Sequence, residues 1–258
     1  PAAESPHCDE RFLCATPQER VYRNGLWDEG LLPHRGIDAA ERAQQKRFHE
    51  RMEELKQARG SDGRRAFAIP MELSSRDPAW LALDRMSFSE WLTANDFTAP
   101  SLHWLANYAT RDDYGTAHTQ TSAWAGLHYF ACRNGEAANA ADDTVLTQPD
   151  GNAWLMRGLA AKAEGRIVTG ALVWQIEEGK GAVAVDVLFG AKTVRFEARQ
   201  LIWAAPAFVL PRVWPAMSGE LKAAALSGDY APWLVANLHL ADFPEEQHGA
   251  PPAWDNVF

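Results

Sequence analysis

The spacing of hydrophobic positions divides the chain at Thr144 into a largely helical first half and a strand-rich later part. The clearest helical stretch covers residues 38–59, where Phe48, Met52 and Leu55 recur at intervals of four and three. Most other positions of that stretch are polar or charged. The pattern therefore predicts a surface helix with a narrow apolar stripe and a solvated opposite face.

Local turn and cap signals predict two further elements of the first half. Asn24-Gly25 stands between two short β-like runs, and this dipeptide is a strong signal of a two-residue hairpin turn. Ser87 and Glu90 form a capping-box pattern, which opens a short helix that ends near Asn95. A β-hairpin and a capped helix are therefore expected.

Two more helices are expected in SLHWLANYATRDD (101–113) and SAWAGLHYFACRNG (122–135), the second ending at Gly135. Aromatic and histidine residues are dense in these helices and in the loop between them. Aromatic walls with a few polar tips suit a pocket for an organic amine, a sugar or another flat ligand. The candidate substrate-binding residues are Tyr108, Trp124, His128 and Tyr129. The alternative is that these rings simply pack between the helices.

After Thr144 the hydrophobic runs become short and β-like. GALVWQIEE (170–178), AVAVDVLF (182–189) and KTVRFEA (192–198) follow one another with tight glycine turns between them. Such connections are too short for crossover helices and predict an antiparallel meander. RQLIWAA (199–205) is apolar on both faces, as a strand buried inside a layered sheet is.

The meander is flanked by helical segments. A helix is expected directly after the turn PDGN (149–152), and another in SGELKAAALSG (218–228). WLVANLHLADF (233–243) is expected to be one more strand. The predicted fold class is therefore α+β, with a helix-rich first half that contains a β-hairpin, followed by a helix, the meander and strands of a mixed sheet.

Composition and charge narrow the classes of function. The 258 residues are 47% hydrophobic and 23% charged, as in ordinary globular proteins, and the apolar run LIWAAPAFVL (201–210) is too short to cross a bilayer. A formal net charge of −9 argues against a nucleic-acid partner, because binding to phosphates needs clustered lysine and arginine. The three cysteines, Cys8, Cys14 and Cys132, are too scattered for a disulfide framework and are interpreted as free thiols. Oligomeric state and compartment, cytoplasm or periplasm, stay open.

Three short motifs resemble binding sites without fulfilling their requirements. GKGAVA (179–184) matches the dinucleotide fingerprint G-x-G-x-x-A, but it lies between two strands rather than between a strand and a helix. The PDGN turn offers a single glycine, Gly151, and Asp150 would repel an anion. HERME at His49 has Glu53 in the place of the second histidine of a zinc motif, so no metal site is predicted.

A cysteine hydrolase is the weakest of the alternatives. Cys132 follows His128 by four residues, one helical turn, which is the spacing of a possible thiolate–imidazolium pair. The sequence shows neither a third orienting group nor an oxyanion turn, and it contains no G-x-S-x-G elbow. A packed helix with a buried cysteine is the simpler interpretation.

The order of the later segments resembles the flavin-containing amine oxidase family. The segments are LTQPDGNAWLMRGLA (146–160), VWQI (173–176) and RQLIWAAPAFVLPRVWP (199–215). In that family a Pro-x-Gly turn starts a helix, a V-x-x-I strand and a meander follow, and a buried strand ends in Ala-x-Pro. The resemblance covers about residues 144–243. RDDYGT…SAWAGLHYFACRNG (111–135) is similar to a bacterial amine oxidase-like subgroup and extends it over most of the chain.

The resemblance implies an FAD-dependent oxidoreductase that transfers hydride from an amine or related substrate to FAD. It implies a first section of the substrate-binding domain at residues 1–146, a middle part of the FAD-binding domain at 147–206, and a second substrate-domain section at 207–258. Val173 is similar to the family position whose backbone touches the adenine of FAD.

The family's N-terminal G-x-G-x-x-G, its ribose-binding acid and its C-terminal flavin segment have no counterpart in this sequence. The chain is therefore expected to be an internal section that is inactive alone and does not retain FAD. The alternative function is a non-catalytic module that binds a small molecule or sugar between aromatic walls. No catalytic residue is assigned.

Overall fold

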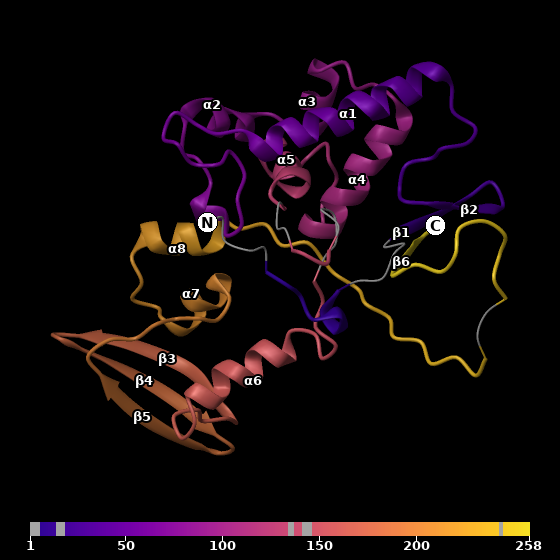
Figure 1. Ribbon diagram of the computed structural model, residues 1–258. Coiled ribbons are helices and arrows are strands. Elements are labelled where there is room, and N and C mark those ends of the chain that lie inside the picture. Colours follow the sequence, from indigo (N-terminus) through magenta and orange to yellow (C-terminus); the bar gives the residue numbers. More distant parts are fainter. Residues whose placement is uncertain (1–5, 14–18, 134–136, 141–145, 243–244) are drawn as a thin grey trace. The chain divides into compact units, whose positions relative to one another are not determined.

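The computed structural model describes residues 6–13, 19–133, 137–140, 146–242 and 245–258. The chain forms two compact units. The first unit consists of residues 1–151 and 231–258, and the second unit of residues 152–230. The described residues contain eight α-helices and two three-stranded sheets (Figure 1), an α+β content that agrees with the predicted fold class.

The first unit contains the predicted β-hairpin. Strands β1 (Glu19–Arg23) and β2 (Leu26–Glu29) are antiparallel, with Arg23 opposite Leu26. Asn24 and Gly25 both have positive φ, 51° and 83°, so the two-residue turn is confirmed. A third strand, β6 (Asp255–Val257), lies parallel to β1 and completes a mixed sheet of order β2-β1-β6 (Figure 1).

Arg20 attaches the segment before β6 to the hairpin. Its side chain is only 6% exposed, and its guanidinium lies 4.0 Å from the centroid of the Trp27 ring. Nη1 donates to the Glu246 carboxylate at 3.1 Å and to the backbone oxygen of Ala250 at 3.0 Å. A buried arginine with several acceptors is well satisfied, and it joins parts of the chain that are more than 220 residues apart.

Helices α1 (Ala39–Gln57) and α3 (Phe88–Ala94) form as predicted. Asp38 caps α1, and its apolar stripe is buried in the core. Ser87 and Glu90 form the reciprocal capping box of α3, which ends at Asn95. A short helix, α2 (Pro78–Leu81), precedes α3. These helices share one hydrophobic core with the two aromatic helices, α4 (Pro100–Tyr114) and α5 (Ala123–Ala131).

Helices α4 (Pro100–Tyr114) and α5 (Ala123–Ala131) are the two aromatic helices. The second ends before the predicted Gly135, which lies outside the described residues, so the predicted end is wrong. Arg65 explains the earlier end, because its guanidinium donates to the carbonyl oxygens of Ala131 and Cys132 at 3.2 to 3.4 Å. Carbonyls at a helix end need such external donors.

The second unit contains the predicted meander. Helix α6 (Ala153–Lys162) follows the PDGN turn. Strands β3 (Ala171–Gly179), β4 (Ala182–Phe189) and β5 (Lys192–Ala198) then pair antiparallel in the order β3-β4-β5. The GKGAVA motif is the hairpin turn between β3 and β4, with Gly181 at φ 75°. The antiparallel meander is confirmed.

One face of the meander carries a small core. Ile176, Val185 and Val187 are buried together with Val213 of α7 (Leu210–Val213). The last helix of the unit is α8 (Gly219–Leu226), in the predicted position. No helix in the described part of the chain is long and apolar enough to span a bilayer.

Two predicted strands do not form. Residues 199–205 and the described part of 233–243 have no regular strand structure, and no strand pairs with them among the described residues. Ile202 is 89% exposed and Leu234 is 94% exposed. A strand needs a neighbouring edge to satisfy its N–H and C=O groups, so apolar alternation without such an edge does not produce one.

Candidate functional site

The predicted residues Trp124 and His128 form one stacked pair on α5. Their ring centroids are 5.0 Å apart with planes at 24°, and the Trp124 ring also lies 5.6 Å from Phe67. The His128 Nε2–H donates to the backbone oxygen of Ala68 at 2.9 Å, which fixes the tautomer of the ring. Both side chains are half-buried against the first unit's core.

This arrangement disagrees with the cysteine hydrolase interpretation. Cys132 is buried at the C-cap of α5, and burial raises the pKa of its thiol. An activated cysteine needs a lowered pKa and a base within hydrogen-bond reach. The bond between Cys132 and His128 runs from backbone N–H to backbone oxygen and joins no side chains. Cys8 and Cys132 are free thiols as predicted, and Cys14 lies outside the described residues.

Tyr108 and Tyr129, the other two predicted residues, come from different helices. Tyr108 on α4 stacks on Trp104 with centroids 5.6 Å apart and planes at 11°. Tyr129 on α5 packs edge-on against Phe130 at 4.9 Å, and the Arg133 guanidinium lies 5.2 Å from its ring centroid. Both tyrosines are half-buried.

The charges of several carboxylates act on these two tyrosines. Burial, together with the smaller effects of the negative charges of Asp112, Asp255 and Glu19, raises the pKa of Tyr108 to about 12. Burial also raises the pKa of Tyr129, and Glu19 and Asp112 contribute again, while the positive charge of Arg133 lowers it. A phenol is sensitive only to charges nearby, so α4, α5, β1 and β6 bring these groups to one place. We call these five residues the acidic–aromatic cluster.

The carboxylates of the cluster also act on one another. Glu19 on β1 lies directly opposite Asp255 on β6 in the parallel pairing. Burial and the charge of Asp112 raise the pKa of Asp255. The charges of Asp112 and Asp255 therefore repel each other, and a bound cation would relieve that repulsion. The cluster is therefore suited to a positively charged ligand.

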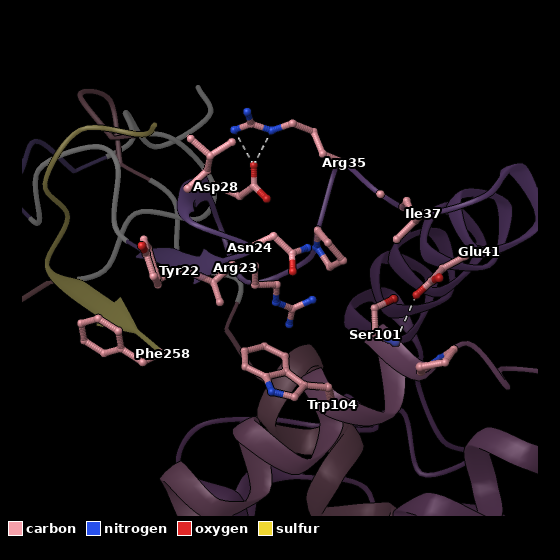
Figure 2. Close-up of a pocket in the computed structure, with 15 residues that line it drawn as sticks. Tyr22, Arg23, Asn24, Asp28, Arg35, Ile37, Glu41, Ser101, Trp104 and Phe258 are labelled. Carbon is pink, nitrogen blue, oxygen red and sulfur yellow. Dashed lines mark hydrogen bonds and ion pairs between the residues drawn. The ribbon is translucent and has the colours of Figure 1, made fainter. Parts of the chain in front are cut away.

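A cavity of about 570 Å³ lies in the first unit, between the hairpin and the N-terminal ends of α1 and α4 (Figure 2). Arg35 bonds Asp28 through Nε at 2.9 Å and Nη2 at 2.7 Å. Across the cavity, Glu41 accepts the backbone N–H of Ser101 at 3.2 Å. Arg23 projects between these pairs and stacks on Trp104, 4.4 Å from the ring centroid.

None of the predicted substrate-binding residues lines this cavity. The structure thus brings Tyr108 and Tyr129 to one acidic group, while Trp124 and His128 pack against Phe67 elsewhere on α5. Sequence reasoning missed Glu19, Asp255 and the residues of the cavity. No local signal marks them, because β1 and β6 pair across more than 230 residues.

Val173, the predicted adenine contact, lies on β3 in register with Val187 of β4. Its side chain is half-buried against the core of the meander, and a bulge follows it before Gln175. The side chain is thus used for packing, and the backbone at the bulge is the part that a ligand could address. Its contact with FAD stays a prediction.

The fold is similar to that of solved amine oxidases. No protein-family model matches the chain, and no curated protein matches it significantly. A structure from a study of redesigned cofactor binding, the wild type bound to putrescine, has a TM-score of 0.54 at 15% sequence identity. A triple mutant from the same study has a TM-score of 0.56 at 13% identity. Both are putrescine oxidases.

The similarity covers 83% of this chain but only 45% and 46% of the two solved chains. This chain therefore spans about half the length of the structures that it matches. At such low identity the similarity shows the fold alone. The amine oxidase-like fold agrees with the resemblance found in the sequence.

Proposed function

We propose that the chain is the substrate-domain-rich part of an FAD-dependent amine oxidase-like oxidoreductase, and that the acidic–aromatic cluster binds the substrate's ammonium group. Three observations support this proposal. The order of the later segments resembles the amine oxidase family, the fold is similar to that of putrescine oxidase, and the charges of shared carboxylates act on two half-buried tyrosines. The last observation carries the proposal.

An alkylammonium ion fits this cluster on physical grounds. Tyrosine rings attract cations, as the Arg133 guanidinium beside the Tyr129 ring shows, and a desolvated cation–π contact contributes up to about 2 kcal/mol. Asp112 and Asp255 supply the opposite charge. Both tyrosines are protonated at neutral pH, since an ordinary phenol has a pKa near 10 and burial raises it further, so their rings can contact the ligand without adding a negative charge.

The described residues do not form a complete FAD site. A dinucleotide fold holds the pyrophosphate in a glycine-rich turn between a strand and a helix. Here the G-x-G-x-x-A turn joins two strands, and the turn before α6 has Gly151 as its single glycine. What these residues offer FAD is the backbone near Val173. We therefore derive no catalytic step through the flavin.

A second candidate function is a non-catalytic module that binds a small molecule. The cavity of about 570 Å³ in the first unit favours it, because this volume falls in the usual range of ligand pockets. The two functions differ in the location of the bound ligand. An amine substrate would occupy the acidic–aromatic cluster, and the ligand of a module would occupy the cavity.

Titration with putrescine tests the proposed function. We expect Asp112→Asn to weaken putrescine binding about three- to tenfold, because one attractive carboxylate is lost. Binding should also weaken as ionic strength rises. Asp84→Asn is the matched control, since Asp84 is an exposed carboxylate on another helix of the same unit. Equal effects of the two substitutions would show that the cluster does not bind the amine.

A further inference from the structure

The four charged side chains of the cavity in Figure 2 are incompletely paired. Arg35 and Asp28 bond each other. Glu41 accepts one bond, from the backbone N–H of Ser101, through Oε1. Arg23 makes no hydrogen bond or ion pair in the described part of the chain, although it lies in the range of the charges of Asp28 and Glu41. One guanidinium and one carboxylate oxygen thus remain available across the same space.

The cavity is built on fixed parts of the first unit. Val21, Asp28 and Ser101 line it and are 1%, 7% and 5% exposed. The Arg23 guanidinium lies over the ring of Trp104, and this cation–π contact restrains it. Leu26, Ile37 and Phe258 add apolar side chains to the wall. A restrained guanidinium, whose N–H groups can donate to a ligand, within an otherwise apolar wall is a usual arrangement of a small-molecule site.

The charges decide which ligand fits. Arg35 already neutralises Asp28, so the remaining pair is the cation of Arg23 and the anion of Glu41. A ligand that carries only a carboxylate would leave Glu41 unpaired nearby, and a ligand that carries only an ammonium group would leave Arg23 unpaired. Leaving a desolvated charge without a partner is costly. A ligand with both groups satisfies both side chains.

We propose that this cavity binds a small zwitterion with one carboxylate, one ammonium group and a short apolar body. The carboxylate accepts from the Arg23 guanidinium, and the ammonium group donates to Glu41. The apolar body contacts the wall near Ile37. This site is distinct from the acidic–aromatic cluster; it does not depend on the amine oxidase-like function, and it specifies the ligand of the second candidate function.

Three ligands with the same apolar body test the charge requirement on the unmodified chain. They are leucine, its analogue without the amino group (isocaproate) and its analogue without the carboxylate (isoamylamine). Amide signals of Asn24, Leu26 and Ser101 in NMR spectra report binding in the cavity itself. We expect leucine to perturb these signals with an affinity at least about tenfold higher than that of either analogue.

Substitutions then test the two side chains. Arg23→Met and Glu41→Gln should each weaken leucine binding about tenfold or more. Arg47→Met is the matched control, because Arg47 also stacks on an aromatic ring, Phe97 at 5.4 Å, but lies outside the cavity. It should leave leucine binding unchanged.

Three results would overturn the proposal. They are the absence of leucine binding in the cavity, equal binding of isocaproate or isoamylamine at the same signals, and an equal effect of Arg47→Met and Arg23→Met. The comparison of the three ligands uses the natural sequence, so it decides the question even if a substituted chain fails to fold.

Discussion

Replacing Gly126 by alanine should destabilise the first unit, although alanine favours helices. Gly126 is buried in α5 against Phe88 of α3. A Cβ at this position would lie 2.4 Å from the Cγ and Cδ1 atoms of the ring, whereas ordinary van der Waals contact begins at 3.4 Å. Phe88 is 0% exposed, so its ring is enclosed by other parts of the core.

The expected change in the free energy of unfolding is the sum of two opposing contributions. Alanine stabilises a helix relative to glycine by about 1 kcal/mol. Overpacking a core costs about 1–3 kcal/mol, and an overlap of about 1 Å with a fixed ring belongs at the upper end of that range. Gly126→Ala should therefore lower the stability of the first unit by about 2 kcal/mol.

Gly158 of α6 is the matched control. It also lies in a helix, but no atom outside its own helix backbone and its chain neighbours lies within 4 Å of a Cβ added there. Gly158→Ala should stabilise its helix by up to about 1 kcal/mol. Hydrogen exchange followed by mass spectrometry resolves the two helices separately, so each effect is read in its own unit.

The expected pattern is faster exchange in α5 for Gly126→Ala and equal or slower exchange in α6 for Gly158→Ala. Unchanged or slower exchange in α5 would refute the contact between Gly126 and Phe88. A second test uses Phe88→Leu as the background. There the cost of Gly126→Ala should shrink, because a smaller side chain gives room to the new methyl group.

Three other predictions concern the helix ends, the meander and the cofactor. Arg65→Met should lower stability in urea by about 1–3 kcal/mol, because it removes a donor from carbonyls at the ends of α1 and α5. Arg59→Met, which removes an exposed hydrogen bond to the Gly63 carbonyl oxygen, should not lower the stability. Arg195 donates two hydrogen bonds to Asp186 and holds its pKa below the usual 3.8. This stabilising contribution is present above pH 3.8 and is lost as pH falls below it, so urea denaturation of Asp186→Asn should lack that acid-dependent loss. A titration of the chain with FAD, followed by flavin fluorescence, should show no saturable micromolar binding. Immobilising a free cofactor costs roughly 4 kcal/mol or more, and the described residues provide few contacts to offset this cost.

Elements set by local chemistry could be predicted from the sequence. The Asn24-Gly25 turn needs only residues that tolerate positive φ, and the capping box of Ser87 and Glu90 needs only groups three residues apart. The meander follows from short glycine connections, which allow neighbouring strands to pair only antiparallel. None of these elements depends on distant parts of the chain.

Elements that require a distant partner could not be predicted in this way. Residues 199–205 have the apolar pattern of a buried strand but no strand edge beside them in the described part of the chain. Conversely, β6 is only three residues long and forms because β1 offers it an edge. The hydrophobic pattern of a segment shows which side chains could face a core. Whether the segment forms a strand depends on whether another strand offers it a free edge.

The candidate site also combines a part that the sequence predicts and a part that depends on distant residues. The density of rings on two neighbouring helices pointed to Tyr108 and Tyr129, which lie in the acidic–aromatic cluster. The charges that complete this cluster come from both ends of the chain, Glu19 on β1 and Asp255 on β6. A sequence pattern with a short period does not detect two carboxylates that a parallel strand pair places side by side.

A crystal structure of the chain with bound putrescine tests the proposed amine site most directly. The account predicts an ammonium group within hydrogen-bond distance, about 2.7–3.2 Å, of Asp112 or Asp255, with the alkyl chain against the rings of Tyr108 and Tyr129. Putrescine bound beside Arg23, or at positions away from these four residues, would contradict it.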